Sequence, residues 1–323
     1  MKLTEIVKQV RNSSHIALMG HVGGDSDCYG SLFGLKMGLE TLGKKVDVIS
    51  TEDFPESLDF LFFYFPGEIS DKYVPGADLA IFIDAPEVKR LVAPEIAKQY
   101  KAEGTKIIQL DHHLKGDLTD FADISFVDTQ ACAASEIVFD LLQELEVNID
   151  KNIATCLLAG IVGDTSSFQN QNTTKECFAA SSELMKRGAR LRTIVSNTFG
   201  GKEVDTLKVW GLAMERLSVN ERLHAVSTYL TYEDIEKFGL SPEATNGIIN
   251  FLNSIKDAKM VMLITEREKG TIKVSLRTRD EHVDVAKIAR QLGGGGHVKA
   301  AAFSIHGSLK TLTEGGNNHI VVV

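Results

Sequence analysis

Cysteine is scarce in this chain of 323 residues. There are four cysteines, and no two of them form a CxxC pair. So few thiols in a chain of this length do not make a disulfide framework, and they do not indicate a structural zinc site. We therefore expect a protein of a reducing compartment, the cytoplasm.

Long hydrophobic runs are also missing. The most apolar stretch, LDFLFFYFP at residues 58–66, is far shorter than the roughly 20 residues that span a bilayer. We expect it to form buried core rather than an exposed interface or a lid. The first 18 residues lack the apolar segment and the small-residue cleavage site of a signal peptide. No membrane partner is indicated.

An excess of positive charge is absent as well. The chain has 35 Lys and Arg against 44 Asp and Glu, for a net charge of −9, while its hydrophobic fraction of 43% is ordinary for a globular protein. Proteins that bind long duplex nucleic acid through bulk charge usually lean basic. We therefore expect no such partner, and a phosphate-bearing ligand would have to be small or bound at a local site.

What is present in the first half is an alternation of short apolar runs with helical patterns. This alternation is typical of a parallel sheet with helices on both faces, and it predicts an α/β, Rossmann-like domain. The expected strands are residues 15–20, 45–50, 77–85 and 105–113, and the expected helices are residues 31–43, 94–101, 135–145 and 153–161.

The second half has a different pattern. Residues 174–217 are helical throughout, after which strands and helices mix. We expect one domain at 1–190, a helical connection at 191–217 and a smaller mixed α/β domain at 218–323. In the last domain the expected strands are residues 222–231, 259–268, 270–279 and 300–305, and the expected helices are residues 245–254 and 283–292.

Acidic and imidazole side chains gather where the expected strands and the helix 153–161 end. A lone Asp after a strand is usually a turn former or a helix cap, and a lone His is usually a satisfied polar residue. Four such places at one rim favour a site, because ligands bind outside the carboxyl ends of parallel strands. The residues are His21, Asp25, Asp27, Asp84, Asp111, His112, His113 and Asp164.

The chemistry of this set indicates a metal centre. Carboxylates gathered without a cation would repel one another. Oxygen and imidazole ligands without thiolate suit Mn²⁺ or Mg²⁺, and their number is enough for two ions that share a bridging carboxylate, as in displacement at phosphorus. Gly23 and Gly24 allow a sharp bend in the first loop, where Asp25 and Asp27 could face the same side.

A glycine run, GGGGH at residues 293–297, follows the helix expected at 283–292. A glycine run alone is weak evidence, because it is often only a flexible turn. Its backbone N–H groups and His297 could bind an anion, and Arg277 and Arg279 could reach a second phosphate or lie on a solvated strand face.

These motifs together resemble a known family. HVGGDSD, IDAP, LDHH and GDTSSF, in this order, resemble the four motifs of the DHH phosphoesterases. The later VSLRTR and DVAKIARQLGGGGHVKAAA resemble the DHH-associated domain with its GGGH motif. The resemblance covers nearly the whole chain, and the compact two-domain layout is similar to that of the nano-RNase and 3′-phosphoadenosine-5′-phosphate (pAp) phosphatase group. It implies that the domain at 1–190 is catalytic, that the domain at 218–323 binds substrate and that the active site lies in the cleft between them.

The resemblance implies a role for each residue. His21 and Asp25 would bind one metal ion, Asp27, His112 and Asp164 would bind the other, and Asp84 would bridge them. Asp111 would orient His112, and His113 would contact the scissile phosphate. Arg277, Gly294, Gly295, Gly296 and His297 would bind the substrate. The chain departs from the family pattern at Ser166, where Gly is frequent, and at Val298 and Phe303.

The implied function is a Mn-dependent hydrolase of short 5′-phosphorylated oligoribonucleotides or pAp, acting through a water activated by two metal ions. Alternatives are a phosphodiesterase of pApA or cyclic di-AMP, a polyphosphate or pyrophosphate hydrolase, and a nucleotide-binding module without activity. GGGGH argues against the pyrophosphatases, whose second domain differs. The implied partner is a short single-stranded oligonucleotide or a small nucleotide, and the family resemblance also allows a homodimer.

Overall fold

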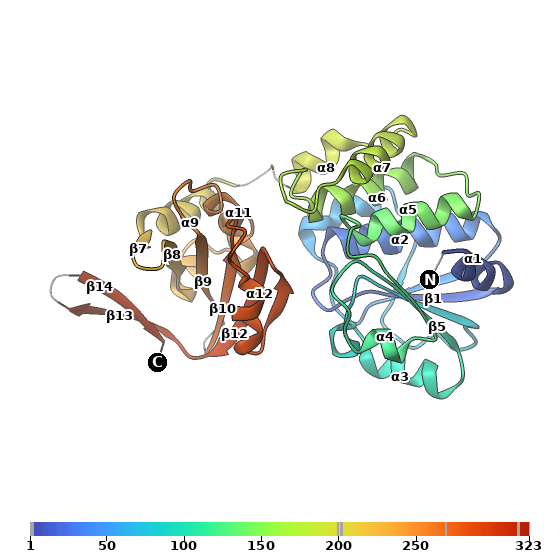
Figure 1. Cartoon of the computed structure of the whole chain (residues 1–323), viewed down its shortest axis with the longest axis horizontal. Helices are drawn as coiled ribbons and strands as arrows, with labels where there is room; N and C mark the ends of the chain where they lie inside the picture. The colour runs from blue at the N-terminus through green and yellow to red at the C-terminus, as the bar shows by residue number, and fades with distance from the viewer. Residues whose placement is uncertain (1–2, 199, 201–202, 269, 315–316, 323) are drawn as a thin grey trace. The chain divides into compact units, whose positions relative to one another are not determined.

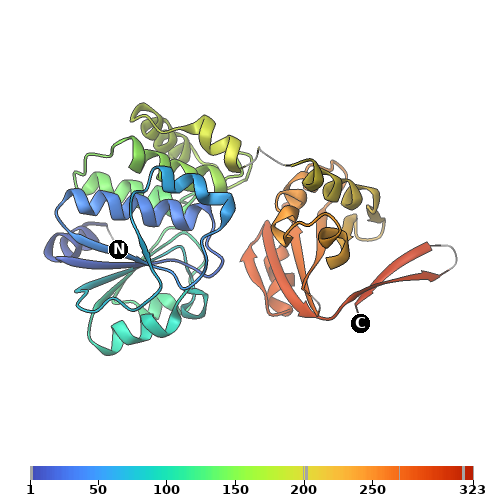
Figure 2. The same ribbon diagram turned by 180° about the vertical axis from the view of Figure 1, so that it is seen from behind.

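The chain folds into two compact units, residues 1–200 and residues 201–323. The computed structural model describes residues 3–198, 200, 203–268, 270–314 and 317–322, and Figures 1 and 2 show it from two sides. The division falls within the stretch predicted as a connection. Helix α8 (Leu191–Thr198) belongs to the first unit and α9 (Val204–Glu215) to the second.

The first unit contains a parallel sheet of six strands in the order β3-β2-β1-β4-β5-β6. This is the order of a doubly wound sheet, so the predicted α/β fold is confirmed. The strands are β1 (His15–Met19), β2 (Lys45–Ile49), β3 (Ile69–Ser70), β4 (Leu79–Ile83), β5 (Lys106–Asp111) and β6 (Ile124–Val127).

Apolar side chains cover both faces of this sheet. Along β1, Ile16 and Leu18 enter one core cluster and Ala17 and Met19 enter another, as the two-residue period of a strand requires. Helices α2 and α5 lie over one face and α3 and α4 over the other (Figure 1). The helices of this unit are α1 (Leu3–Asn12), α2 (Ser26–Thr41), α3 (Pro94–Ala102), α4 (Leu118–Phe121), α5 (Ala134–Glu144), α6 (Lys151–Asp164), α7 (Lys175–Lys186) and α8, with 3₁₀ turns η1 (Glu56–Phe63) and η2 (Val88–Arg90).

The apolar stretch 58–66 is only partly core. Leu61 and Phe65 are buried, and the Phe65 ring stacks on Phe33 of α2 with 3.8 Å between ring centroids. Phe63, in the same 3₁₀ turn as Leu61, is 83% exposed. A short apolar helix cannot bury all of its sides against one neighbour, so the expectation of burial holds for one side of the segment only.

Helix α2 begins five residues earlier than predicted. Asp25 is its N-cap and accepts hydrogen bonds from the backbone N–H groups of Asp27 and Cys28. Asp25 and Asp27 therefore lie at the start of a helix and not in the loop that the sequence pattern suggests. The run DSD begins a helix because an Asp at the N-cap satisfies N–H groups that the helix leaves without partners.

The second unit is a mixed sheet in the order β11-β12-β10-β9-β8-β7, with β8 and β9 parallel and the other pairs antiparallel. Helices α9, α10 and α11 pack with one core cluster of this unit, and α12 packs with another. This confirms the predicted mixed α/β domain. The elements after α9 are β7 (Ser218–Asn220), β8 (Ala225–Leu230), α10 (Tyr232–Glu236), η3 (Pro242–Thr245), α11 (Ile248–Leu252), β9 (Met260–Glu268), β10 (Thr271–Arg277), α12 (Val285–Gln291), β11 (Gly295–His297), β12 (Ala300–His306), β13 (Leu309–Glu314) and β14 (Asn317–Val322).

Several strands lie outside the sequence-based expectations. Strand β7 has only three residues, Ser-Val-Asn, all of them exposed, which is too short a segment to predict a strand, and it pairs with β8. The C-terminal hairpin of β13 and β14 forms a separate two-stranded sheet. Within the described ranges, the structure contains no helix that combines the length and the apolar character needed to cross a membrane.

Helices α2 and α6 cross at glycines, and this close contact positions the ends that carry predicted site residues. A Cβ on Gly30 of α2 would lie 2.5 Å from the Cys156 carbonyl oxygen of α6. A Cβ on Gly160 of α6 would lie 2.0 Å from Ser135 Oγ and 2.7 Å from Asp27 Oδ1. The absence of a side chain at these positions thus lets α2, α5 and α6 meet.

The substitution Gly160→Ala tests this crossing. We expect it to lower the free energy of unfolding by about 1–3 kcal/mol, because the added methyl group has no room. Urea unfolding followed by circular dichroism measures the effect. The control is Gly211→Ala in α9, where a Cβ would meet no atom within 4 Å and where alanine favours a helix by roughly 0.5–1 kcal/mol. Equal effects of the two variants would contradict the argument.

Candidate metal centre

The predicted residues of the first unit come together at one rim of its sheet. His21 follows β1, Asp84 follows β4, Asp111 ends β5, and His112 and His113 come next. In a parallel sheet these strand ends lie at the same edge. Asp27 in the first turn of α2 and Asp164 at the end of α6 reach the same rim through the helix crossing.

Asp84 is the centre of this arrangement. Its side chain is 3% exposed, its backbone is left-handed with φ of 61°, and its Oδ1 is buried without a hydrogen bond among the described residues. Such strain and such an unsatisfied acceptor are typical of functional sites. Three groups of ligand atoms in this unit that lie within 4.8 Å of one another all include it: His21, Asp25 and Asp84; Asp27, Asp84 and His112; Asp84, Asp111 and His113.

Two histidines present Nε2 to this centre. His21 Nδ1 donates to the Val22 carbonyl oxygen at 2.9 Å, and its Nε2 lies 3.4 Å from Asp84 Oδ2. His112 Nδ1 faces the Ala131 carbonyl oxygen at 3.3 Å, and its Nε2 lies 3.4 Å from Asp84 Oδ1. A carbonyl oxygen only accepts, so each ring donates from Nδ1. Nε2 is the nitrogen that faces the carboxylates, and it could bind a cation once it gives up its proton. This is the usual orientation of a metal-ligating histidine.

Helix α5 compensates the charge of Asp27. Asp27 Oδ2 accepts from the Ala134 N–H at 2.6 Å and Oδ1 from the Ser135 N–H at 2.9 Å, at the positive end of that helix. Asp27 Oδ2 also lies 3.9 Å from His112 Nε2. The sequence carries no signal for this contact, because Asp27 and α5 are 107 residues apart.

The pKa values describe a site with more carboxylates than it can ionise together. Burial raises the pKa of Asp27 to about 8, aided by the charge of Asp84, and burial also raises the pKa of Asp164 to about 6. Burial opposes ionisation of Asp84 too, but the imidazoles of His112 and His21 hold its pKa well below the usual range. Burial likewise opposes charge on His21, yet Asp84 and Asp25 raise its pKa to about 10. Added positive charge would allow all of these carboxylates to ionise.

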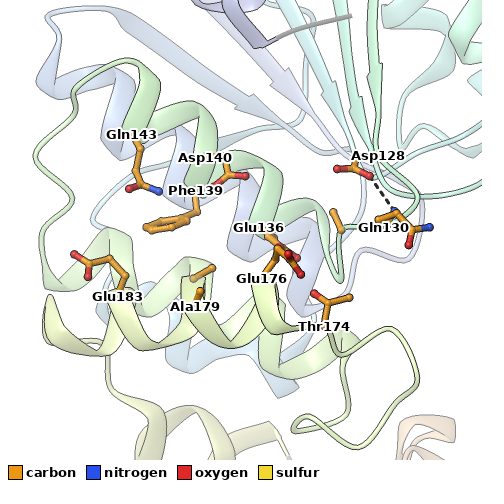
Figure 3. Close-up of a pocket in the computed structure, with 12 residues that line it drawn as sticks. Asp128, Gln130, Glu136, Phe139, Asp140, Gln143, Thr174, Glu176, Ala179 and Glu183 are labelled. Carbon is orange, nitrogen blue, oxygen red and sulfur yellow. Dashed lines mark hydrogen bonds between the residues drawn. The ribbon is translucent and has the colours of Figure 1, made fainter.

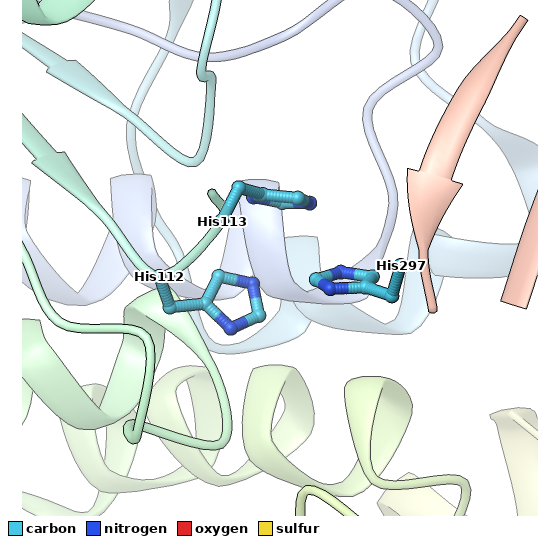
Figure 4. A group of neighbouring side chains, drawn as sticks. All are labelled: His112, His113 and His297. Atoms are coloured by element: carbon cyan, nitrogen blue, oxygen red, sulfur yellow. The ribbon is translucent and has the colours of Figure 1, made fainter. Parts of the chain in front are cut away.

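Asp111 does not orient the ring of His112 as expected. Its Oδ1 lies 2.8 Å from Nδ1 of His113 and accepts the backbone N–H groups of His112 and His113. Figure 4 shows the two rings, which follow β5 with centroids 4.6 Å apart and an interplanar angle of 70°. Consecutive residues after a strand turn to different sides, so one carboxylate reaches the second ring but not the first.

The glycine run of the second unit is less open to an anion than predicted. The Gly294 N–H donates to the Ala289 carbonyl oxygen at 2.8 Å, so this amide closes the end of α12 and is not available to grip a phosphate. Gly295 to His297 form β11, which pairs with β12. A Cβ on Gly294 would lie 2.2 Å from the Ala302 carbonyl oxygen, so glycine is needed here for the approach of two strands.

Arg277 and Arg279 lie at the end of β10 and just after it. Arg277 donates through Nε to Asn250 Oδ1 at 3.2 Å and through a terminal nitrogen to its neighbour's carbonyl oxygen, Leu276 O, at 3.0 Å. Arg279 is exposed. The contact with Asn250 fixes the direction of the Arg277 guanidinium, and the sequence pattern does not contain it.

A separate hollow of about 610 Å³ lies between α5 and α7 (Figure 3). No Lys or Arg is found among the described residues that line it, and none of the predicted site residues lines it. Glu136 there is buried and accepts the Cys132 N–H at 2.7 Å. The other carboxylates are Asp128, Asp140, Glu176 and Glu183.

Comparisons with known proteins identify the family of this chain. The DHH family N-terminal domain matches residues 15–161, and the DHHA1 domain matches residues 225–314. The chain belongs to the DHH family, and it is a phosphoesterase, a hydrolase of phosphate ester bonds.

Individual relatives cover nearly the whole chain. The "Bifunctional oligoribonuclease and PAP phosphatase NrnA" of Thermus thermophilus is 30% identical over 310 residues, which are 94% of this chain and 88% of that protein. The protein of the same name from Bacillus subtilis is 28% identical over 306 residues, with 94% and 93% covered. The crystal structure of an exopolyphosphatase-related protein from Bacteroides fragilis is similar with a TM-score of 0.84 at 25% identity, covering 93% of this chain and 90% of that one.

The hollow between α5 and α7 gives a prediction about pH. Asp140 is exposed on one side of this hollow, yet partial burial of its carboxylate and the charges of Glu136, Asp128 and Glu144 raise its pKa from 3.8 to about 6. The folded protein therefore holds a proton that the unfolded chain has released, and stability falls as pH rises from about 4 through about 6. We expect Asp140→Asn to raise the melting temperature at pH 8 and to leave it unchanged at pH 4.

Thermal melts of the variant and the parent between pH 4 and pH 8 measure this difference. The control is Asp71→Asn, which changes an exposed carboxylate in the loop after β3. An equal shift of the melting temperature in both variants, or a shift in Asp140→Asn that does not depend on pH, would show that the charge of Asp140 does not destabilise the fold.

Proposed function

We propose that this protein hydrolyses short 5′-phosphorylated oligoribonucleotides and pAp to mononucleotides, with two divalent cations, Mn²⁺ in the first place, as cofactors. The observation that supports the proposal most strongly is the buried Asp84, whose Oδ1 has no hydrogen bond among the described residues although two imidazoles and further carboxylates surround it. The relatives named as oligoribonuclease and PAP phosphatase support the substrate class.

The donor set fits such cations. Carboxylate oxygens and imidazole nitrogens are ligands that Mn²⁺ and Mg²⁺ accept. His21 and Asp25 would hold one ion with Asp84, and Asp27, His112 and Asp164 would hold the other with the same Asp84. When bound, the two ions supply an activated water and neutralise charge on the phosphate oxygens.

The chain's own groups perform the remaining tasks in this proposal. Asp84 stays ionised at neutral pH because its neighbours lower its pKa, so it is ready to bind cations. The Asp111 carboxylate holds the Nδ1–H of His113, which directs Nε2 of that ring to the phosphate or the leaving oxygen. In the second unit, His297 and Arg277 bind the phosphate of the substrate, with Gly295 and Gly296 beside them and Gly294 shaping the turn.

The substrate is small in this proposal. A net charge of −9 does not favour long duplex nucleic acid, whereas a short strand needs only a local cluster of donors. Hydrolysis in the cytoplasm is part of the same proposal and follows from the scarcity of cysteine, and a homodimer is the assembly that the family resemblance allows.

A turnover assay tests the function. Purified protein with Mn²⁺ is given pAp, 5′-phosphorylated oligoribonucleotides of graded length, pApA, cyclic di-AMP and polyphosphate. We expect mononucleotides from the shortest oligoribonucleotides and AMP from pAp. If Mn²⁺-loaded protein leaves both untouched, the proposal is wrong, and turnover of polyphosphate alone would move it to that alternative.

Replacement of the shared carboxylate tests the role of Asp84. We expect Asp84→Asn to lower kcat at least 1,000-fold, about 4 kcal/mol, because one residue serves both ions. Calorimetric titration with Mn²⁺ should show weaker binding by the same variant. Asp117→Asn, outside the rim, is the control. A rate like that of the parent would refute the assignment of two ions that share Asp84.

His297→Ala separates substrate binding from metal binding. We expect KM to rise roughly tenfold, about 1.4 kcal/mol, with little change in the affinity for Mn²⁺, because this residue is assigned to the substrate phosphate. His306→Ala, at the end of the neighbouring strand β12, is the matched control. Loss of bound manganese in His297→Ala would show that the residue belongs to the metal centre.

A further inference from the structure

The loop after α6 folds back over the end of that helix. Three consecutive residues, Ser166, Ser167 and Phe168, have φ of 47°, 59° and 64°. Residues with a Cβ rarely adopt this conformation, and a run of three requires other contacts to hold it. Ser166 is also the position at which the family pattern often has glycine, which adopts such angles easily. The backbone is therefore strained in this turn, and the hydrogen bonds of the residues after it show which side chains the turn positions.

The turn brings two asparagine side chains back to Asp164. Asn170 Nδ2 donates to the backbone carbonyl oxygen of Asp164 at 2.9 Å and to Ser166 Oγ at 3.2 Å. Asn172 Nδ2 donates to the carboxylate Oδ2 of Asp164 at 3.0 Å and to the Cys132 carbonyl oxygen at 2.8 Å. Of the two, Asn172 is thus the one that holds the carboxylate.

The oxygen that Asn172 holds is the one that faces the metal centre. Asp164 Oδ2 lies 3.9 Å from Nε2 of His112. A carboxamide suits this position because it donates a hydrogen bond and adds no charge to a rim that already contains several carboxylates. The Oδ1 of Asn172 is buried and has no hydrogen bond among the described residues. The hydrogen bonds that orient this side chain are therefore those of its Nδ2.

We propose that Asn172 is a positioning residue of the metal centre, which holds the Asp164 carboxylate toward His112 before a cation binds. The inference rests on the proposed function, because it takes Asp164 as a metal ligand. It adds a residue outside the four family motifs, and it gives the strained turn at Ser166–Phe168 a purpose. Hydrogen-bonded partners of this kind orient metal ligands, and their loss commonly weakens metal affinity 10- to 100-fold.

The test compares two asparagines of one loop. Asn172→Ala removes the bond to the carboxylate, and Asn170→Ala removes a bond to the backbone of the same residue. Calorimetric titration of the full chain with Mn²⁺ gives the affinity, and thermal melts after treatment with a chelator give the stability. We expect Asn172→Ala to weaken Mn²⁺ binding at least tenfold and Asn170→Ala to weaken it less than threefold. Equal affinities in the two variants would overturn the inference.

A double-mutant cycle distinguishes positioning from a general effect on the fold. In an Asp164→Asn background, Asn172→Ala should cause no further loss of Mn²⁺ affinity, because the ligand that it positions is already gone. If the losses add, Asn172 acts elsewhere and the inference is wrong. Asn172→Ser, which is too short to reach Asp164, is measured alongside Asn172→Ala, and failure of both to fold would assign Asn172 to the fold and overturn the inference.

These outcomes are separate from those of the proposed function. A protein that binds Mn²⁺ through Asp164 and Asn172 but hydrolyses none of the offered substrates would refute the proposed function and leave the inference standing. A protein that hydrolyses pAp and has unchanged Mn²⁺ affinity in Asn172→Ala would do the reverse. A parent chain that binds no divalent cation would overturn both.

Discussion

The burial of a charged Asp84 among other carboxylates is the constraint on which the site depends. An ionised carboxylate loses its hydration when it is buried, and it is stable only next to positive charge or hydrogen-bond donors. Here the imidazoles of His21 and His112 lie 3.4 Å from its oxygens. Its left-handed backbone, forced at the end of β4, keeps the carboxylate at the rim of the sheet. A bound cation would add further positive charge next to this carboxylate.

The negative charges of the neighbouring carboxylates are stabilised by hydrogen bonds from backbone N–H groups or from a side-chain amide. Two N–H groups at the start of α5 hold Asp27, and Asn172 holds Asp164. The glycines of α2 and α6 allow these helices to approach closely enough for such contacts. Packing and electrostatics are therefore linked, because a methyl group at Gly160 would disturb both the helix crossing and the position of Asp27.

The second unit shows how a motif can have more than one cause. The run GGGGH is consistent with a phosphate site, yet Gly294 closes α12 and lets β11 approach β12. The N–H groups of Gly293 and Gly294 therefore close the end of α12, and the proposed function assigns the substrate phosphate to His297 and Arg277 instead. Glycine in such a run is required by the backbone even before a ligand is considered.

The sequence by itself determined the doubly wound sheet, the mixed second domain and the membership of the eight residues at the rim. These follow from local patterns: apolar runs that alternate with amphipathic ones, and acidic residues placed where strands end. It did not determine the start of α2 at Ser26, the partner of Asp111, or the strand at Gly295–His297. Only the tertiary structure decided these, and also the contacts of Asp27 with α5 and of Asn172 with Asp164. The physical reason is that a hydrogen bond between groups far apart in the chain depends on how helices pack, and packing is set by the whole core rather than by any single segment.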